Sequence, residues 1–391
     1  MHPNLRKSAV NWIDGMKVNK MHFQQTEEWI IDYLKDVVAV NLNDYNYGLL
    51  PSAEGEGTSL NLQVEVEQTQ FVRATLLSCR AITRGGIRIE ITPFISKQFN
   101  LDKNLLEVNF NLKEATNQQY DIVVTVNPFS RIPAGDPDPE EHPLRHPFTL
   151  PNYTVDVIPS SHINTEEFST YHLTLGRFRV VAGEVQIMEY TPPCTQVLSH
   201  LPLVQKYRDF EKLLYSIRNS LTQYIKKARG ADSNSVNHDL LALAESTLMS
   251  IAIFQDEFAI DLPHKPPVEL YKFFVRFVRL ISTELNCMPE DDRLLVYNTL
   301  NQNFAAGTFE NIVTAVLDLK YSHREIHQTL EKLHTEIAKI NEVVSKLPFN
   351  ISSTHYQPPK PPTPQPPPPP VEEPPKKSGP TVKIFRGGQR L

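Results

Sequence analysis

The sequence of 391 residues lacks several features that mark particular classes of protein. No apolar run approaches the roughly 20 residues that a helix needs to span a bilayer, and the opening MHPNLRKSAVNW has no secretory apolar core. Only three cysteines occur, Cys79, Cys194 and Cys287, far apart and without metal-ligand spacing. Such sparse cysteines are typical of a reducing compartment. We therefore expect a cytoplasmic protein with no segment inserted in the membrane.

Basic residues and catalytic motifs are also scarce. With 39 Lys and Arg against 45 Asp and Glu, the formal net charge is −6, which argues against a nucleic-acid-binding protein. The glycines near Gly55 and Gly85 lack the lysine and the helix of a phosphate-binding loop. No Ser-His-Asp or Cys-His arrangement can be justified from spacing. We expect no enzyme activity and no cofactor.

One histidine pair suggests a metal site. In DPDPEEHPLRHPF, His142 and His146 stand four residues apart, which would suit zinc on a helix. Pro139, Pro143 and Pro147 make a continuous helix implausible, because each ring removes a donor and restricts the preceding residue. The stretch is therefore predicted to be a structured loop without a metal.

Alternating apolar residues predict strands up to about Pro193. The segments SLNLQVEV, QFVRATLLSCRA, IRIEI, YDIVVTV and YHLTLGRFRVVAGEVQIMEY read as strands, the last broken at Gly176 and Gly183. A helix is expected to precede them over 24–38. The fold class is predicted to be α+β, with a sandwich-like β domain over 1–196.

From residue 197 to 347 the pattern is helical. Helices are expected from about Leu203, over 237–258 and over 267–285. One long helix is expected from Ile312 to Leu347, and His323 is the polar residue in its otherwise apolar seam. The first and last carry heptad-like apolar seams. Such a seam packs either inside a monomeric bundle or between chains. Two seams favour association, and mixed Ile and Leu favours three strands or four. We predict a homotrimer, with these seam residues: Leu203, Phe210, Leu214, Ile217, Ile326, Leu330, Leu333, Ile337, Ile340 and Val344.

Residues 348–391 form a proline-rich segment that cannot pack a core and is predicted to be disordered. Val382, Ile384 and Phe385 interrupt its polar end. They suggest a docking peptide on a stiff arm, the alternative being a tail without a partner.

The protein's two tryptophans, Trp12 and Trp29, lie close together near the N-terminus. A terminus this aromatic is expected to dock, either in the protein's own core or on a partner. His22 is expected to be a hydrogen-bonded packing residue rather than a ligand or a base.

The same stretch, NWIDGMKVNKMHFQQ, resembles the opening of type VI secretion baseplate subunits of the TssK family. Further similar segments follow in order: YGLL from Tyr47, DPEEHPLRHPF from Asp138, YTPPC from Tyr190, and PPVELYKFFVRFVRLISTEL. The matching N-terminal residues, which become candidates for the wedge interface, are Trp12, Gly15, Met16, His22, Phe23 and Gln24.

The resemblance implies a β-rich shoulder, a helical neck, and a trimer whose shoulder binds the wedge subunits TssF and TssG. It implies a non-catalytic adaptor that links the wedge to the envelope-anchoring complex at the inner face of the cytoplasmic membrane. The family's small C-terminal head has no counterpart after Leu347, where only the proline-rich tail follows. We therefore expect a divergent form, in which the tail or another subunit makes the envelope contact.

Two other functions fit parts of the chain. A phage tail baseplate or receptor-binding protein would share a β shoulder and a trimeric stalk. A signalling scaffold is suggested only by PPPPP, a ligand for aromatic grooves, and leaves the first 347 residues unexplained.

Overall fold

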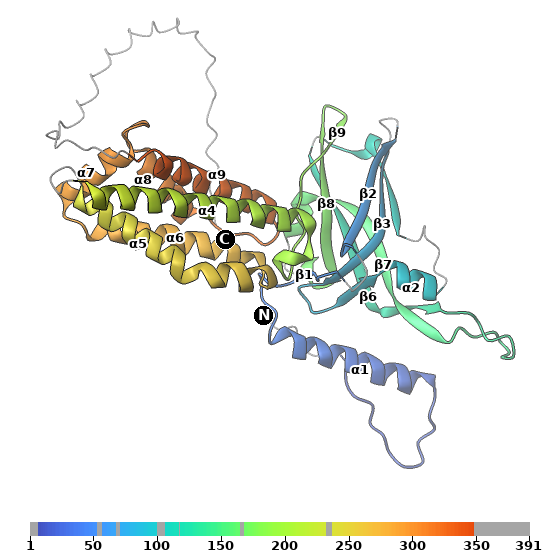
Figure 1. The fold of residues 1–391 in the computed structure, drawn as a ribbon. Helices are drawn as coiled ribbons and strands as arrows, with labels where there is room; N and C mark the ends of the chain where they lie inside the picture. Colours follow the sequence, from blue (N-terminus) through green and yellow to red (C-terminus); the bar gives the residue numbers. More distant parts are fainter. Residues whose placement is uncertain are drawn as a thin grey trace, which may run out of the picture. The chain divides into compact units, whose positions relative to one another are not determined.

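The computed structural model describes residues 7–52, 57–67, 71–99, 106–116, 118–164, 168–231 and 237–347. All of these belong to one compact unit, and the fold is α+β as predicted (Figure 1). The expected docking residues Val382, Ile384 and Phe385 lie outside the described residues. Within those ranges, no helix combines the length and the apolar character needed to cross a membrane.

The first sheet is antiparallel and is centred on β3, which pairs with each of the other strands. Buried and less buried residues alternate along β3, as expected for a strand with one face in a core. The strands are β1 (Gly48–Leu49), β2 (Leu60–Glu67), β3 (Phe71–Ile82), β4 (Arg88–Ile91) and β5 (Glu107–Asn111), and the short helix α2 (Pro93–Gln98) follows β4.

The second sheet has the strand order β7-β6-β8-β9, again antiparallel. Its strands are β6 (Gln119–Ala134), β7 (Phe148–Pro159), β8 (His172–Val181) and β9 (Glu184–Ile187), and the short helix α3 (Phe168–Tyr171) precedes β8. The expected break at Gly183 is present, but the break expected at Gly176 is wrong, because β8 continues through it. A Cβ at Gly176 would lie 2.9 Å from Leu62 Cδ2, so this glycine lets the two sheets approach closely.

Aromatic packing joins the two sheets into a sandwich. Phe110 of β5 lies 4.9 Å from Tyr120 of β6, and Tyr120 stacks on Phe178 of β8 at 5.4 Å between ring centroids. The backbone N–H of Glu90 in β4 donates to the Tyr153 hydroxyl in β7 at 3.3 Å. The N-terminal half is therefore a β-sandwich with an aromatic centre.

The helices of the C-terminal half lie side by side (Figure 1). They are α4 (Leu201–Gly230), α5 (His238–Asp256), α6 (Pro267–Cys287), α7 (Glu290–Leu300), α8 (Thr308–Asp318) and α9 (Ile326–Ser345). Helices α4, α5 and α6 match the expected segments, whereas α7 was not anticipated.

The single long helix expected from Ile312 to Leu347 is wrong. It is two helices, α8 and α9, separated by the segment 319–325. This segment binds the sandwich instead of continuing a helix: His323 Nε2 hydrogen-bonds the Tyr47 carbonyl at 2.9 Å, and Arg324 Nη1 donates to the Ile163 carbonyl at 2.6 Å. These contacts outweigh the local preference for helix.

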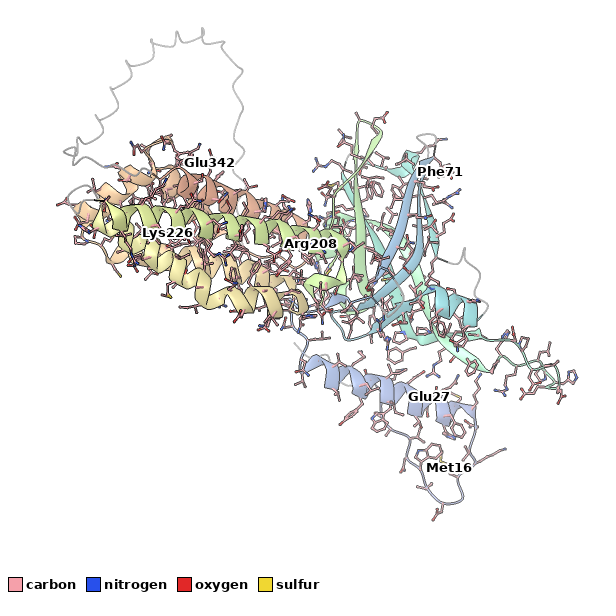
Figure 2. The ribbon with its side chains drawn as sticks, viewed as in Figure 1. Met16, Glu27, Phe71, Arg208, Lys226 and Glu342 are labelled. Atoms are coloured by element: carbon pink, nitrogen blue, oxygen red, sulfur yellow. The ribbon has the colours of Figure 1, made fainter. Side chains whose placement is uncertain are left out.

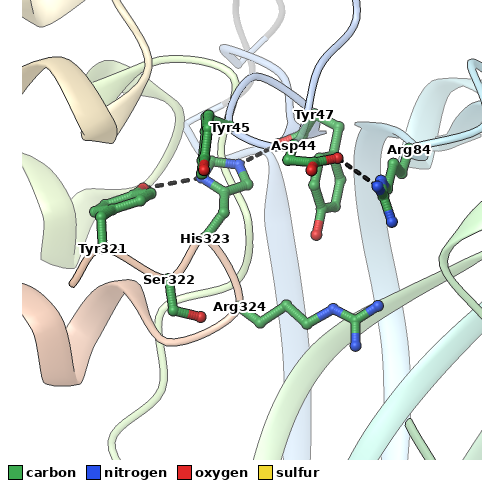
Figure 3. Close-up of a pocket in the computed structure, with 8 residues that line it drawn as sticks. All are labelled: Asp44, Tyr45, Tyr47, Arg84, Tyr321, Ser322, His323 and Arg324. Atoms are coloured by element: carbon green, nitrogen blue, oxygen red, sulfur yellow. Dashed lines mark hydrogen bonds and ion pairs between the residues drawn. The ribbon is translucent and has the colours of Figure 1, made fainter. Parts of the chain in front are cut away.

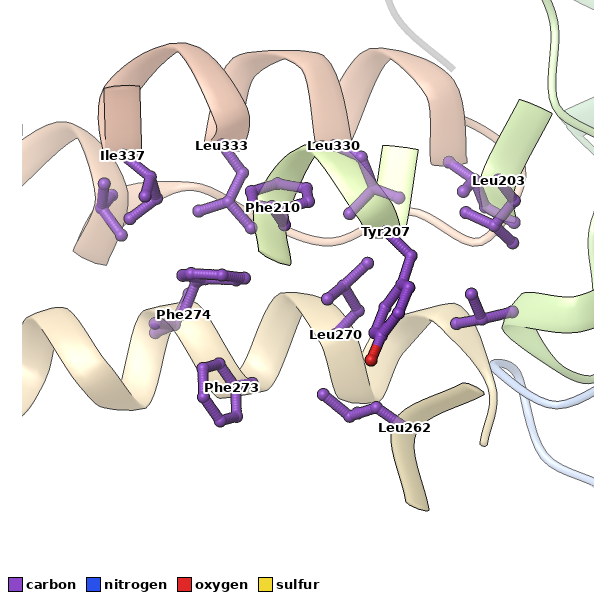
Figure 4. Packing of buried hydrophobic residues seen from close by; sticks show 14 of the residues in the cluster. Leu203, Tyr207, Phe210, Leu262, Leu270, Phe273, Phe274, Leu330, Leu333 and Ile337 are labelled. Atoms are coloured by element: carbon purple, nitrogen blue, oxygen red, sulfur yellow. The ribbon is translucent and has the colours of Figure 1, made fainter. Parts of the chain in front are cut away.

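The apolar seams pack against each other within one chain (Figure 4). Phe210 of α4, for example, stacks on Phe274 of α6 at 4.6 Å. No predicted seam residue is more than 9% exposed: Leu203, Phe210, Leu214, Ile217, Ile326, Leu330, Leu333, Ile337, Ile340 and Val344. The prediction that they face other copies is therefore wrong, because the intramolecular bundle already buries them.

A buried ion cluster joins the sandwich to the bundle. Arg177 of β8 donates to both carboxylate oxygens of Asp121 on β6, at 2.7 and 3.2 Å, and to Glu325 at 2.7 Å. Burial alone would lower the pKa of Arg177, but the hydrogen bonds to Asp121 and Glu325 outweigh it and hold the pKa above its usual value. Glu325 immediately precedes α9, so the cluster ties β8 to the start of that helix.

Candidate functional site

Helix α1 (Lys20–Ala39) begins with reciprocal capping, confirming the helix expected near the N-terminus. Asn19 Oδ1 accepts from the Met21 N–H at 2.9 Å, and His22 Nδ1 accepts from the Asn19 N–H at 3.2 Å. Two donors at the helix start are thereby satisfied. His22 is therefore a hydrogen-bonded residue of the helix cap, and this agrees with the hydrogen-bonded role expected from the sequence.

The arm before α1 folds back on the helix. An Asp14–Gly15 turn, with Gly15 at φ +77°, lets the Met16 N–H donate to the Ile13 carbonyl. Trp12 then packs edge-on against His22 at 5.9 Å and tilts against Phe23 at 6.3 Å. The structure thus brings together Trp12, His22 and Phe23, while Met16 and Gln24 are half-buried.

This aromatic cluster is on the surface. Trp12 is 49% exposed and Phe23 is 59% exposed. Trp29 stacks on Tyr33 at 5.9 Å, and neither tryptophan belongs to the hydrophobic core. The alternative that the tryptophans fill the core of the sandwich is therefore wrong.

Helix α1 turns charged residues toward the body of the protein. Its buried residues are Asp32 and Lys35, whose side chains pair at 3.5 Å. The Lys35 ammonium lies 5.4 Å from the Tyr171 ring centroid, and the Lys7 N–H donates to Asp32 at 3.0 Å. A surface helix ordinarily buries its apolar stripe, so the polarity of α1 is inverted.

The outward face of α1 and the arm together expose large apolar side chains, and we call this set the N-terminal surface. Figure 2 draws the side chains of both segments, with Met16 of the arm and Glu27 of α1 labelled. It comprises Trp12, Ile13, Val18, Met21, Phe23, Ile30, Tyr33, Leu34, Val37 and Val40. Monomeric proteins rarely leave such gatherings uncovered, and those found usually bind another protein. The N-terminal surface is the strongest candidate for a docking site in the described chain.

A second exposed stripe, apolar at four of its six positions, runs along α5. Its exposed members alternate by four and three residues, the spacing of a helix that packs against another helix. They are Ala242, Ser246, Met249, Ile253, Asp256 and Ile260, the last lying in the π-helical turn η5 (Glu257–Asp261) that continues α5. Met249, Ile253 and Ile260 are each more than 60% exposed.

The DPDPEEHPLRHPF stretch forms the loop of the β6–β7 hairpin, as predicted. Asp138 and Arg145 make an isolated antiparallel bridge, Arg145 pairs with Glu141, and His146 Nδ1 lies 2.7 Å from the Gly135 carbonyl. Among the described residues, no group of three His, Cys, Asp or Glu side chains could hold a metal.

Comparison with solved structures identifies the fold. A crystal structure of TssK matches 86% of this chain and 69% of its own chain, with 14% identity and a TM-score of 0.51. A chain of the baseplate complex from the type VI secretion system is also similar, with 15% identity and a TM-score of 0.50. The match covers 88% of this chain and 71% of the chain in that complex. The chain has the TssK fold. No family model matches the sequence, and no curated protein is similar enough to count as a relative.

Two of the segments that resemble TssK in sequence lie side by side in this fold. In YGLL, the Leu49 N–H donates to the Pro193 carbonyl of YTPPC at 2.7 Å, and the Thr195 N–H donates to the Leu49 carbonyl at 2.9 Å. Gly48 has φ +113°, and a Cβ there would lie 1.9 Å from the Pro193 oxygen. Only glycine fits at this crossing, because a side chain would overlap the Pro193 backbone and the positive φ disfavours other residues.

Proposed function

We propose that this chain is a non-catalytic baseplate subunit of a type VI secretion system, and that its N-terminal surface binds the wedge subunits TssF and TssG. The observation that carries the proposal is the inverted helix α1, which leaves aromatic and aliphatic side chains outside. Interfaces are enriched in such aromatic anchors. TssF and TssG are proposed as the partners because the chain has the TssK fold and its N-terminal segment resembles that family.

Capture of the wedge subunits tests this proposal. Replacing Trp12 and Phe23 by Ala should abolish co-purification of TssF and TssG with the full chain, since buried aromatic anchors contribute about 2 kcal/mol or more each. The melting temperature should change little, because both side chains are about half exposed in the free protein and neither belongs to the hydrophobic core.

The matched control is Phe94→Ala. Phe94 lies on α2, outside the N-terminal surface, and is 67% exposed. It should leave capture unchanged. Full capture by the Trp12, Phe23 variant would contradict the proposed interface.

The proposal includes a homotrimer, with the contact moved from the seams to the exposed stripe on α5. The seam residues are enclosed by the bundle, whereas Met249, Ile253 and Ile260 are exposed at helix-packing spacing. Uncharged residues predominate along the stripe, so a second helix could pack there with little desolvation of charge.

Ile253→Glu should dissociate the trimer to a folded monomer, because it places a carboxylate in an apolar helix contact. Sedimentation equilibrium gives the mass and circular dichroism the helix content. Gln255→Glu is the control, because Gln255 lies off the stripe and its side-chain oxygen accepts from Arg218 at 3.0 Å, a role that a carboxylate retains. A trimer that persists in Ile253→Glu at low micromolar concentration would show that the stripe is not the contact.

The contact with the envelope is proposed from the sequence alone. We assign it to residues 348–391, with Val382, Ile384 and Phe385 as the docking residues. Extended proline-rich segments act as semi-rigid spacers, so this part of the chain suits a contact made at a distance from the bundle.

A further inference from the structure

A cavity of about 320 Å³ lies where three segments of the chain meet (Figure 3). These are the loop after α1, the turn between β3 and β4, and the segment between α8 and α9. The residues that line it include Asp44, Tyr47, Arg84, Tyr321, His323 and Arg324. The lining is mostly polar, although it stands at the joint between sandwich and bundle.

His323 contributes no charge to this cavity. Burial lowers its pKa to about 4, so the ring is neutral at pH 7. The Tyr47 carbonyl can only accept, so Nε2–H donates to it at 2.9 Å. Nδ1 must then accept from the Tyr321 hydroxyl, also at 2.9 Å. Both ring nitrogens are therefore occupied.

Two guanidinium groups give the cavity a cationic character. Arg84 pairs with Asp44, and Arg324 donates one N–H to the Ile163 carbonyl. Two positive charges thus face a single carboxylate among the lining residues. Burial raises the pKa of Tyr47, although the charge of Arg324 opposes this, so its hydroxyl remains a donor at pH 7. In Figure 3 the hydroxyl end of Tyr47 lies between the guanidinium groups of Arg84 and Arg324.

We propose that this cavity binds a carboxylate, held by Arg84 and Arg324 with a hydrogen bond from Tyr47. A guanidinium presents paired N–H donors that match the two oxygens of a carboxylate. The volume lies near the lower end of the roughly 300–1,000 Å³ usual for small-ligand sites. It has room for an acidic side chain of a partner protein or for a small free dicarboxylate.

Asp44 is the internal competitor for this ligand. Its side chain is 60% exposed, and ion pairs that open to water hold their partners weakly. An incoming carboxylate can therefore take its place on Arg84. This predicts opposite effects for two substitutions at the same ion pair, which a purely structural role would not produce.

Isothermal titration of the full chain tests the proposal, with succinate as the free ligand and an acetylated, amidated Glu-Glu peptide as the side-chain ligand. Saturable binding of either probe is expected, and the tighter one identifies the source of the carboxylate. Arg84→Gln should weaken binding about tenfold or more, as expected for a lost charged hydrogen bond. Asp44→Asn should tighten binding severalfold, because it removes the competing charge.

The matched control is Arg88→Gln. Arg88 is 62% exposed, pairs with Glu90, and does not line the cavity. It should leave both affinities unchanged. The proposal is overturned if neither probe binds at millimolar concentration, if affinity survives Arg84→Gln, if Asp44→Asn weakens binding, or if inorganic phosphate binds more tightly than both carboxylates.

Discussion

Leu333→Asp should unfold the protein rather than dissociate an assembly. Leu333 is fully buried between the helices of one chain, with Phe210 and Phe274 in the same interior (Figure 4). Removing a buried leucine side chain costs about 2–5 kcal/mol, and burying an unpaired carboxylate adds several more. Because the stability of a domain is only about 5–15 kcal/mol, most of it would be lost. Thermal melts followed by circular dichroism measure the effect.

Thr335→Asp is the matched control on the same helix. Thr335 is exposed, and the substitution introduces the same charge two residues away. We expect a shift in stability of at most about 0.5 kcal/mol. A Leu333→Asp protein that melts like the parent chain but sediments at a lower mass would restore the seam as an interface between copies.

Arg177→Met should be strongly destabilising at pH 7. The substitution leaves Asp121, which is 2% exposed, without its bidentate partner. It also removes the hydrogen bond to Glu325. Breaking a buried ion pair from one side typically costs about 3–5 kcal/mol, because the remaining charge stays buried and unpaired. Denaturant unfolding gives the loss directly.

Two companion variants separate this effect from simple loss of a surface charge. Arg179→Met lies two residues along β8 and is exposed, so it should cost little. Asp121→Asn combined with Arg177→Met should recover part of the stability, since no buried charge is then left at the pair. Failure of the double variant to recover stability would show that packing, and not charge, explains the loss.

Three features could be predicted from the sequence: the α+β class, the order of most elements, and the loop formed by the proline-interrupted histidine stretch. Alternation with a period of two depends only on which side of a strand is buried, so β2, β3 and β4 were found close to their observed bounds. Prolines act locally, through the lost donor and the restricted backbone, and therefore exclude the interior of a helix whatever the distant contacts are. The N-terminal aromatic cluster was likewise visible in the sequence, and the structure leaves Trp12 and Phe23 of that cluster exposed.

What covers each apolar face could not be predicted from the sequence, because it depends on contacts between distant residues. A heptad-like stripe indicates that one side of a helix is apolar. It does not indicate whether the helix packed against that side belongs to the same chain or to another copy. Leu333 proved to be internal, whereas Ile253, in a less conspicuous pattern, is exposed. Helix α1 shows the same limit, because distant partners accompany the burial of Asp32 and Lys35: the Lys7 N–H donates to Asp32, and aromatic rings lie beside Lys35. The break at 319–325 also depended on distant partners, since the Tyr47 carbonyl that binds His323 lies far away in the sequence. The spacing of apolar residues shows which face of a helix or strand is apolar. Contacts between residues far apart in the sequence determine what packs against that face.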